Sequence, residues 1–270
     1  MAHLNLLTFD IEEWFQANYR MPGDRPMPER DDRLERNVER LLDICVRHGA
    51  TASFFVLGET AERYPGLVGE IKRRGHEIAS HGYRHALVYD RTPQDFAADL
   101  RRSIALLENL AGERVRGFRA PSWSIGPHMD WFFALLAENE LIYDSSLFPM
   151  KTFLYGDSTA EAFPHKVRDI FEFPASTFRF LGRRVPFASG FFFRFFSSSV
   201  IRRAIRSLNR RGLPAMICLH PREIDPSAPR LALPLRERFI HYHGIRSTER
   251  KLTHLLDSFR FVSIREYLNL

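Results

Sequence analysis

Residues 77–85, with the sequence EIASHGYRH, place a short apolar run directly before a turn that contains two histidines. His81 and His85 stand four residues apart, a spacing at which two imidazoles can bind one borderline cation such as Zn²⁺. The chain has 11 histidines, so this pair can equally consist of two ordinary turn residues. A metal site is predicted only if acidic and basic side chains from elsewhere in the chain meet at this turn.

Short apolar stretches alternate with amphipathic helical segments on both sides of the turn, which is typical of a parallel sheet with crossover helices. Thr92 before Pro93 predicts a sharp helix start. At 270 residues, one large α/β domain is the default. We expect strands over residues 4–9, 52–57, 77–79, 115–118, 171–174, 215–219 and 261–264, and helices over 32–48, 67–74, 92–110, 128–139, 198–211 and 249–259.

Three segments have less regular patterns. A Pro-rich loop follows residue 15, and residues 150–166 also predict a loop. Residues 191–196 are phenylalanine at every position except Arg194. We interpret this run as a core strand or as a lid over a barrel, with sugar stacking or membrane-surface contact as the alternatives. The arginines of residues 202–211 are interpreted as a solvated helix face, with contact to a phosphate-bearing carrier as the alternative.

The composition is that of a folded domain with a sizeable core, since 44% of the residues are hydrophobic. The formal charge of +6 permits an anionic partner, but basic residues are mixed with acidic ones, so nucleic acid is not expected. Cys45 and Cys218 lie in apolar segments and imply no disulfide framework. Because the first residues lack the pattern of a signal peptide and no stretch predicts a membrane span, we expect a cytoplasmic location.

Polar side chains follow the predicted strands at the point where each strand ends. Asp10 and Glu12 follow the first strand, and Arg119, Asp144 and His220 follow later ones. Because parallel α/β folds bind ligands at the carboxyl ends of their strands, we expect these side chains to meet His81 and His85 at one mouth. The sequence therefore predicts one convergent site.

The residue types at this mouth indicate hydrolytic metal chemistry. Glu12 with His81 and His85 would supply three metal ligands and leave positions for water and substrate. Asp10 would be the general base, or in the structural alternative a simple turn cap. Arg119 would keep Asp10 ionised and oriented through a charge-assisted pair.

A late histidine completes the predicted set. His220 would be the general acid that protonates the leaving group, and Asp144 would support its imidazolium form. A lone histidine after a strand is more often structural, so this interpretation depends on the other members of the site. Together these residues predict catalysis by proton transfer beside a metal ion.

The order of these motifs resembles the polysaccharide deacetylase family, carbohydrate esterase family 4, over nearly the whole chain. This resemblance implies a distorted (β/α) barrel with about seven parallel strands. It also implies a divalent metal, most commonly Zn²⁺, and hydrolysis of an N-acetyl group on an amino sugar. The motifs that carry the resemblance are Thr8–Glu12, His81–His85, Arg119–Trp123, Tyr143–Ser146 and Leu219–Pro221.

Residues 10–15, DIEEWF, and 220–225, HPREID, are similar to a subgroup of deacetylases encoded at exopolysaccharide and exosortase loci. We therefore expect residues 1–270 to form a single catalytic domain with a family-specific extension over about 225–270. Better-studied members carry adjacent aspartates in the first motif, whereas the second acid here is Glu12, one residue further on. Glu13 is thus a rival to Glu12 as the third ligand.

The resemblance also implies a substrate-binding role for two residues beside Arg119. The backbone N–H of Ser122 would help to hold the oxyanion, and Trp123 would offer a flat face to a pyranose, or simply form a wall of the mouth. The expected substrate is a carbohydrate, for instance a lipid-linked or nucleotide-linked precursor, and contact with the inner membrane face stays open. A hydrolase for non-sugar amides and a non-catalytic glycan-binding protein are the alternatives.

Overall fold

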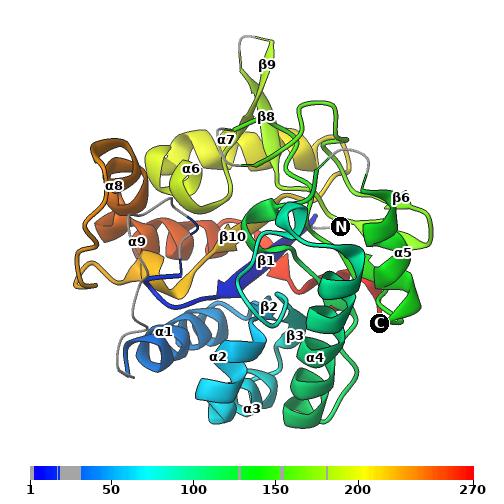
Figure 1. The fold of residues 1–270 in the computed structure, drawn as a ribbon. Coiled ribbons are helices and arrows are strands. Elements are labelled where there is room, and N and C mark those ends of the chain that lie inside the picture. Colours follow the sequence, from blue (N-terminus) through cyan, green and yellow to red (C-terminus); the bar gives the residue numbers. More distant parts are fainter. Residues whose placement is uncertain (1–2, 17, 19–31, 127–128, 153–154, 181) are drawn as a thin grey trace.

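Strands of the chain form one strongly curled, mostly parallel sheet in a computed structural model, which describes all residues except 1–2, 17, 19–31, 127–128, 153–154 and 181 (Figure 1). Nine described strands lie in the order β10-β1-β2-β3-β4-β5-β7-β6, with β11 also paired to β1. Only the β6–β7 pair in this sheet is antiparallel. The predicted α/β class with a distorted barrel is confirmed as an open half-barrel. The strands are β1 (Leu4–Ile11), β2 (Ser53–Val56), β3 (Glu77–Ser80), β4 (Gly117–Phe118), β5 (Tyr143–Asp144), β6 (His165–Val167), β7 (Ile170–Glu172), β10 (Met216–Leu219) and β11 (Arg260–Val262).

Strand β1 decides which side chains enter the barrel. Because successive residues of a strand face opposite sides, Leu7 and Phe9 belong to the outer cluster beneath the helices, while Leu6 belongs to the inner cluster. Thr8 and Asp10 share the parity of Leu6 and are buried. The same alternation that buries the apolar positions under the helices therefore directs the last carboxylate of the strand inward.

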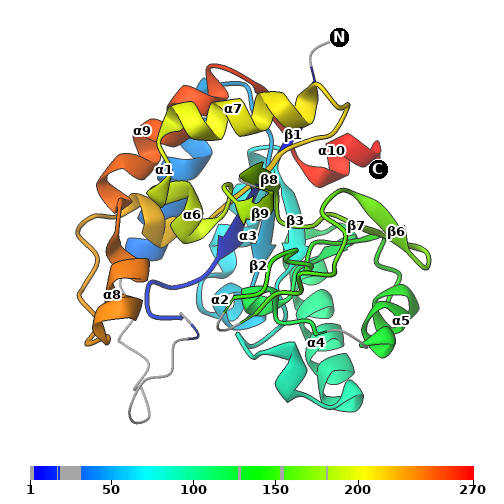
Figure 2. The same ribbon diagram turned by 90° about the horizontal axis from the view of Figure 1, so that it is seen from above.

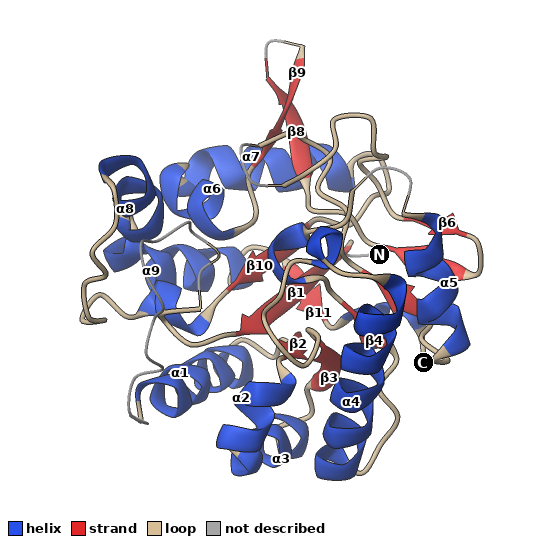
Figure 3. Cartoon of the chain, viewed as in Figure 1, coloured by secondary structure: helices blue, strands red, loops and turns tan. Residues whose placement is uncertain are grey.

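Helices surround the sheet on its outer side (Figures 2 and 3). The side chain of Thr92 accepts a hydrogen bond from the backbone N–H of Asp95, and α4 ends at Gly112 in a left-handed conformation with φ of 63°. None of the helices in the described residues is a candidate to span a membrane, since none combines the necessary length and apolarity. These outer helices are α1 (Arg33–Arg47), α2 (Gly58–Arg63), α3 (Pro65–Arg73), α4 (Pro93–Ala111), α5 (Asp130–Glu138), α7 (Ser198–Asn209) and α9 (Ile245–Leu256).

The short helix α10 (Ile264–Leu268) closes the end of the barrel at which the strands begin. The N–H of Ile264 donates to Ser53 Oγ at 2.8 Å, and the N–H of Arg265 donates to Glu77 Oε2 at 2.9 Å. Ser53 and Glu77 are the first residues of β2 and β3. Only the opposite end, where the strands finish, is therefore available for a site.

The aromatic run differs from the predicted core strand, because Gly190–Phe195 forms helix α6. Phe193 is buried in the main core, whereas Phe195 is 51% exposed. Before the helix, Ser189 makes a bridge to Cys218, so the chain runs briefly beside β10. With phenylalanine at almost every position, the run contains no period that could distinguish a strand from a helix.

Several other elements differ from the sequence expectation. A two-stranded hairpin of β8 (Thr177–Phe180) and β9 (Arg183–Pro186) and helix α8 (Leu235–Tyr242) were not predicted. The loop predicted over 150–166 includes the start of β6, and the predicted last strand ends before Ser263, which caps α10. The Pro-rich loop lies largely outside the described residues, as does the predicted helix start at His128.

Candidate active site

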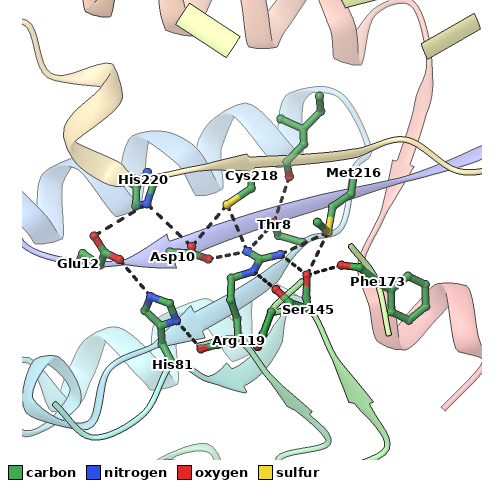
Figure 4. A network of polar contacts seen from close by, with 12 residues as sticks. Thr8, Asp10, Glu12, His81, Arg119, Ser145, Phe173, Met216, Cys218 and His220 are labelled. Carbon is green, nitrogen blue, oxygen red and sulfur yellow. Dashed lines mark hydrogen bonds and ion pairs between the residues drawn. The ribbon is translucent and has the colours of Figure 1, made fainter. Parts of the chain in front are cut away.

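Five of the polar residues predicted at the strand ends lie together, namely Asp10, Glu12, His81, Arg119 and His220 (Figure 4). Asp10 is the last residue but one of strand β1, and Glu12 follows the strand directly. His81 follows β3, Arg119 follows β4 and His220 follows β10. The parallel register places these ends beside one another, since Thr8 pairs with Cys218 and Ser80 pairs with Phe118.

One carboxylate oxygen contacts both histidines of the turn. Oε1 of Glu12 lies 3.0 Å from Nε2 of His81 and 2.8 Å from Nε2 of His85. Nδ1 of His81 lies 2.7 Å from the carbonyl oxygen of Arg119, so this nitrogen carries the proton and Nε2 presents a lone pair. A lone pair and a carboxylate oxygen that face each other need a proton or a cation between them. This donor set fits a borderline divalent cation, and zinc uses such nitrogen and oxygen ligands.

The charge state of Glu12 agrees with such a site. Burial acts to raise the pKa of Glu12, but the neighbouring His85 and His220 and the close contacts with the rings of His81 and His85 lower it well below its ordinary value. The carboxylate is therefore ionised even though the side chain is almost fully buried, with only 5% of its surface exposed. An ionised, buried carboxylate between imidazoles is the state in which it can bind a metal.

The rival acid Glu13 lies elsewhere. Tyr64 donates to Oε1 of Glu13 at 2.6 Å, and the guanidinium of Arg63 lies 3.8 Å from the same atom. The groups of described residues that could hold a metal ion are Glu12 with His81 and His85, and Glu12 with Asp10 and His220. The geometry therefore favours Glu12 as the third ligand.

Arg119 contacts Asp10 in the manner that the sequence predicts. Its Nη1 donates to Oδ1 of Asp10 at 2.6 Å and to Oγ1 of Thr8 at 2.9 Å, and its Nη2 donates to Oγ of Ser145 at 2.8 Å. Burial acts to lower the pKa of Arg119, but the nearby negative charge of Asp10 raises it. Oδ1 of Asp10 is thereby fixed, and Oδ2 accepts from Sγ of Cys218 at 3.4 Å and lies 3.9 Å from Nε2 of His220.

His220 has a carboxylate partner that the sequence interpretation missed. Its Nδ1 lies 3.1 Å from Oε2 of Glu223, and its Nε2 lies 3.8 Å from Oε2 of Glu12. Burial acts to lower the pKa of His220, but the Glu12 and Glu223 carboxylates raise it above its ordinary value. Glu223 is itself held by Nε of Arg194 at 2.7 Å. His220 is thus oriented and stabilised in its protonated form by the short turn Pro221–Ile224.

The predicted support of His220 by Asp144 is wrong, because Asp144 contacts other groups. Its carboxylate accepts from Oγ of Ser146 at 2.6 Å and from the N–H of Ser146 at 3.1 Å. It also neighbours the Glu172 carboxyl, and burial raises the pKa of Asp144 to about 6. Oγ of Ser146 in turn accepts from the N–H of Ala120 at 2.8 Å, so Asp144 stabilises the segment that follows Arg119. The sequence signal for the true partner was the acid three residues after His220.

Ser122 and Trp123 lie in a strained turn at the mouth. Both have positive φ, 54° and 47°, a conformation that costs energy for residues other than glycine and that concentrates at functional sites. Trp123 is 6% exposed and packs on Phe148 and Tyr155, with ring centroids 5.3 and 5.8 Å away. Its Nε1 is buried without a hydrogen-bond partner in the described part of the chain. Trp123 is therefore a wall of the mouth with an unused donor.

A pocket of about 430 Å³ connects these groups, which is within the range of small-molecule sites. Asp10, Glu12, His85 and His220 line it together with Ser122 and Trp123. Its other lining residues come from the segment after β1, the loop before β6, α6 and the residue before it, the turn after β10 and α8. They are Asn18, Met150, Lys151, Thr152, Tyr155, Ser189, Gly190, Phe191, Phe192, Arg194, Arg222, Arg236 and Ile240. Residues far apart in the chain thus form one concave site.

Two family models match separate parts of the chain. Residues 26–131 match the model described as polysaccharide deacetylase, and residues 145–269 match one described as a domain of unknown function, DUF3473. A peptidoglycan-N-acetylglucosamine deacetylase from Bacillus cereus is 32% identical over 82 residues, which cover 30% of this chain and 30% of that protein. A peptidoglycan deacetylase-like protein from Gibberella zeae is 37% identical over 112 residues, 41% of this chain and 32% of that protein. The chain therefore spans about a third of the length of these curated relatives.

Solved structures share the fold over a larger part of the chain. A CE4 family pseudoenzyme from Bacillus anthracis superposes with a TM-score of 0.55 at 13% identity, covering 98% of this chain and 65% of that one. Identity this low shows the fold alone. Since a pseudoenzyme shares the fold, the fold alone does not determine activity, which depends on the side chains of the site.

Proposed function

Because residues 26–131 match the polysaccharide deacetylase model and residues 145–269 match the DUF3473 model, we propose that the protein is a metal-dependent sugar N-deacetylase. It would remove N-acetyl groups from an amino sugar of a polysaccharide or of its lipid-linked or nucleotide-linked precursor. One observation carries the proposal. The ring of His220 lies within 4 Å of the carboxylates of both Asp10 and Glu12, and Glu12 in turn contacts both histidines of the turn.

A divalent cation such as Zn²⁺ would be held by Glu12, His81 and His85, and when bound it would supply Lewis-acid polarisation of the acetyl carbonyl and of the attacking water. The chain itself supplies the proton transfers. Asp10 lines the pocket and Arg119 fixes its Oδ1, so Asp10 takes a proton from water as the oxygen of that water bonds to the carbonyl carbon.

His220 acts in the second half of the reaction. As the bond between carbon and nitrogen breaks, Nε2 of His220 gives its proton to the departing amine, and acetate remains. The Glu223 carboxylate at Nδ1 keeps the ring protonated and turned toward Asp10. The backbone N–H of Ser122 would donate to the oxyanion, because the strained turn presents this segment at the mouth.

The experiment that tests the proposal is acetate release by the metal-loaded protein from a panel of free, nucleotide-linked and lipid-linked N-acetyl sugars. We expect release from at least one sugar and its loss when a chelator removes the metal. The panel also includes cyclic and linear amides that are not sugars. Release from those amides alone would indicate a different C–N hydrolase, and no release from any compound would favour a non-catalytic glycan-binding protein.

A further inference from the structure

The pocket contains cationic side chains that the proposed chemistry does not use. Lys151, Arg222 and Arg236 line it, whereas its only carboxylates among the described residues are Asp10 and Glu12. Those two acids are committed to the base and to the metal ligand set. A bound divalent cation would add further positive charge, so this pocket attracts an anionic group on its ligand.

Arg222 is the best-defined of these cations. Its Nε is buried and has no hydrogen-bond partner in the described part of the chain. Its Nη1 lies 3.4 Å from Nδ1 of the buried His241. Burial is the main cause that lowers the pKa of His241 to about 2, and the positive charge of Arg222 lowers it further. The neutral ring of His241 therefore holds the guanidinium without neutralising it, and Arg222 makes no ion pair with a described carboxylate. Because Arg222 lines the pocket, its charge is positioned to attract an anionic group of a ligand there.

An apolar ledge leads from the pocket to the surface. We define the ledge as Phe191, Phe195, Leu235 and Phe239, which lie on α6 and α8, neighbours in both views of the ribbon (Figures 1 and 2). Phe191 lines the pocket, and its ring centroid lies 5.5 Å from that of Phe195 and 5.8 Å from that of Phe239. Phe195 and Phe239 are each 51% exposed, and Leu235 is 84% exposed. Exposed apolar side chains beside a ligand pocket mark a binding surface.

We propose that the substrate is an N-acetylated amino sugar joined through phosphate to an apolar carrier. The sugar would lie at Asp10 and His220, the phosphate at Arg222 and Arg236, and the start of the carrier on the apolar ledge. This inference rests on the proposed deacetylase function for the identity of the sugar. A nucleotide carrier fits the ledge less well, because its ribose and base need polar partners that Phe195 and Phe239 cannot supply.

Binding of farnesyl diphosphate to the metal-loaded protein tests the proposal, with inorganic pyrophosphate, farnesol and uridine diphosphate as comparison probes. We expect farnesyl diphosphate to bind at least about tenfold more tightly than each of the other three, since only it engages both cations and ledge. Uridine diphosphate that binds as tightly as farnesyl diphosphate would overturn the apolar carrier.

Matched variants separate the two parts of the site. Arg222→Gln and Arg236→Gln should weaken both diphosphate and pyrophosphate binding, whereas Arg238→Gln, on the same helix but outside the pocket lining, should not. Phe239→Ala should weaken farnesyl diphosphate binding alone, whereas Phe180→Ala, at a side chain 58% exposed on the β8–β9 hairpin, should not. If each variant and its control changed the binding affinity equally, the assignment of the phosphate and carrier subsites would be overturned.

The binding experiment is independent of catalysis. If farnesyl diphosphate binds as predicted but no sugar in the acetate-release panel is deacetylated, the deacetylase function fails and the amphipathic ligand site stands. If neutral N-acetyl sugars release acetate while the arginine and phenylalanine variants bind all probes like the wild type, the deacetylase stands and this inference fails.

Discussion

At the scale of single residues, the site depends on which atom each carboxylate presents. Oε1 of Glu12 contacts both His81 and His85, while Glu13, the next residue, is occupied by Tyr64. The two glutamates are adjacent in sequence and both are buried, so they form a matched pair for mutation. Only one of them can belong to the metal site.

Glu12→Gln should lower zinc affinity by at least about tenfold, because even the loss of an indirect partner of a metal ligand costs that much. Glu13→Gln should leave zinc affinity close to that of the wild type. Competition with a chromophoric chelator measures both. Equal losses in the two variants, or a loss only in Glu13→Gln, would show that Glu12 is not the third ligand.

Glu223 is the second residue whose role can be isolated. Its carboxylate raises the pKa of His220, so Glu223→Gln lowers that pKa and reduces the protonated fraction at neutral pH. We expect kcat to fall about tenfold or more near pH 8 and to recover partly near pH 6, with little change in KM. The variant also leaves Arg194 without its buried carboxylate partner, which should cost about 3–5 kcal/mol of stability.

The pH profile distinguishes this role from a purely structural one. Both kcat values are measured well below the melting temperature of the variant. A variant that is merely less stable would then lose the same fraction of its activity at pH 6 and at pH 8. A kcat that falls equally at pH 6 and pH 8 would contradict the assignment of Glu223 as the positioning residue of His220.

At the scale of elements, the short turns after the strands place the catalytic groups. The turn Pro221–Ile224 brings Glu223 back to His220, and the turn after β5 uses Asp144 and Ser146 to hold the backbone beside Arg119. On the neighbouring strand β7, burial and the charge of Asp144 raise the pKa of Glu172 well above its ordinary value. Oε2 of Glu172 is buried and accepts no hydrogen bond from any described residue. A protonated carboxyl suits this position, because a carboxylate oxygen there would have no donor to stabilise its charge.

This carboxyl pair predicts a loss of stability on the alkaline side. Since the folded pKa of Glu172 lies above the unfolded value, its contribution is complete below the unfolded pKa, about 4.3, and is lost as the pH rises through the folded pKa. Glu172→Gln keeps the shape and always carries donor hydrogens. We therefore expect the melting temperature of the wild type to fall more than that of Glu172→Gln between pH 5 and pH 8.

Thermal unfolding followed by circular dichroism at several pH values measures the difference. Glu161→Gln, in the loop before β6 and at the surface, is the control and should follow the wild type. Parallel curves for the wild type and Glu172→Gln would mean that the two carboxyls do not share a proton.

At the scale of the whole molecule, the sequence predicted the strand ends well because parallel strands necessarily finish at the same end of a sheet. Asp10, Glu12, His81 and His220 could therefore be brought together from spacing and order. The partner of His220 could not, because the choice between Asp144 and Glu223 depends on a local turn. Helix α6 and the α8 wall of the pocket depend on long-range contacts that carry no periodic signal.

The two matched regions share one site, which bears on how the chain is divided. His81 lies within residues 26–131, while His220 and the α8 residue Arg236 lie within residues 145–269. Part of the predicted extension over about 225–270 thus lines the pocket. We propose that residues 1–270 act as a single catalytic domain, and a cytoplasmic location stays a prediction from the sequence.

The central claim is that Asp10 and His220 perform proton transfer on an N-acetyl sugar beside a metal held by Glu12, His81 and His85. The most direct test is the rate of acetate release by zinc-loaded Asp10→Asn on the best sugar of the panel. We predict a rate lower than that of the wild type by about 10²–10⁴-fold in a protein that still binds zinc. A zinc-loaded Asp10→Asn variant that releases acetate at the wild-type rate would contradict this account.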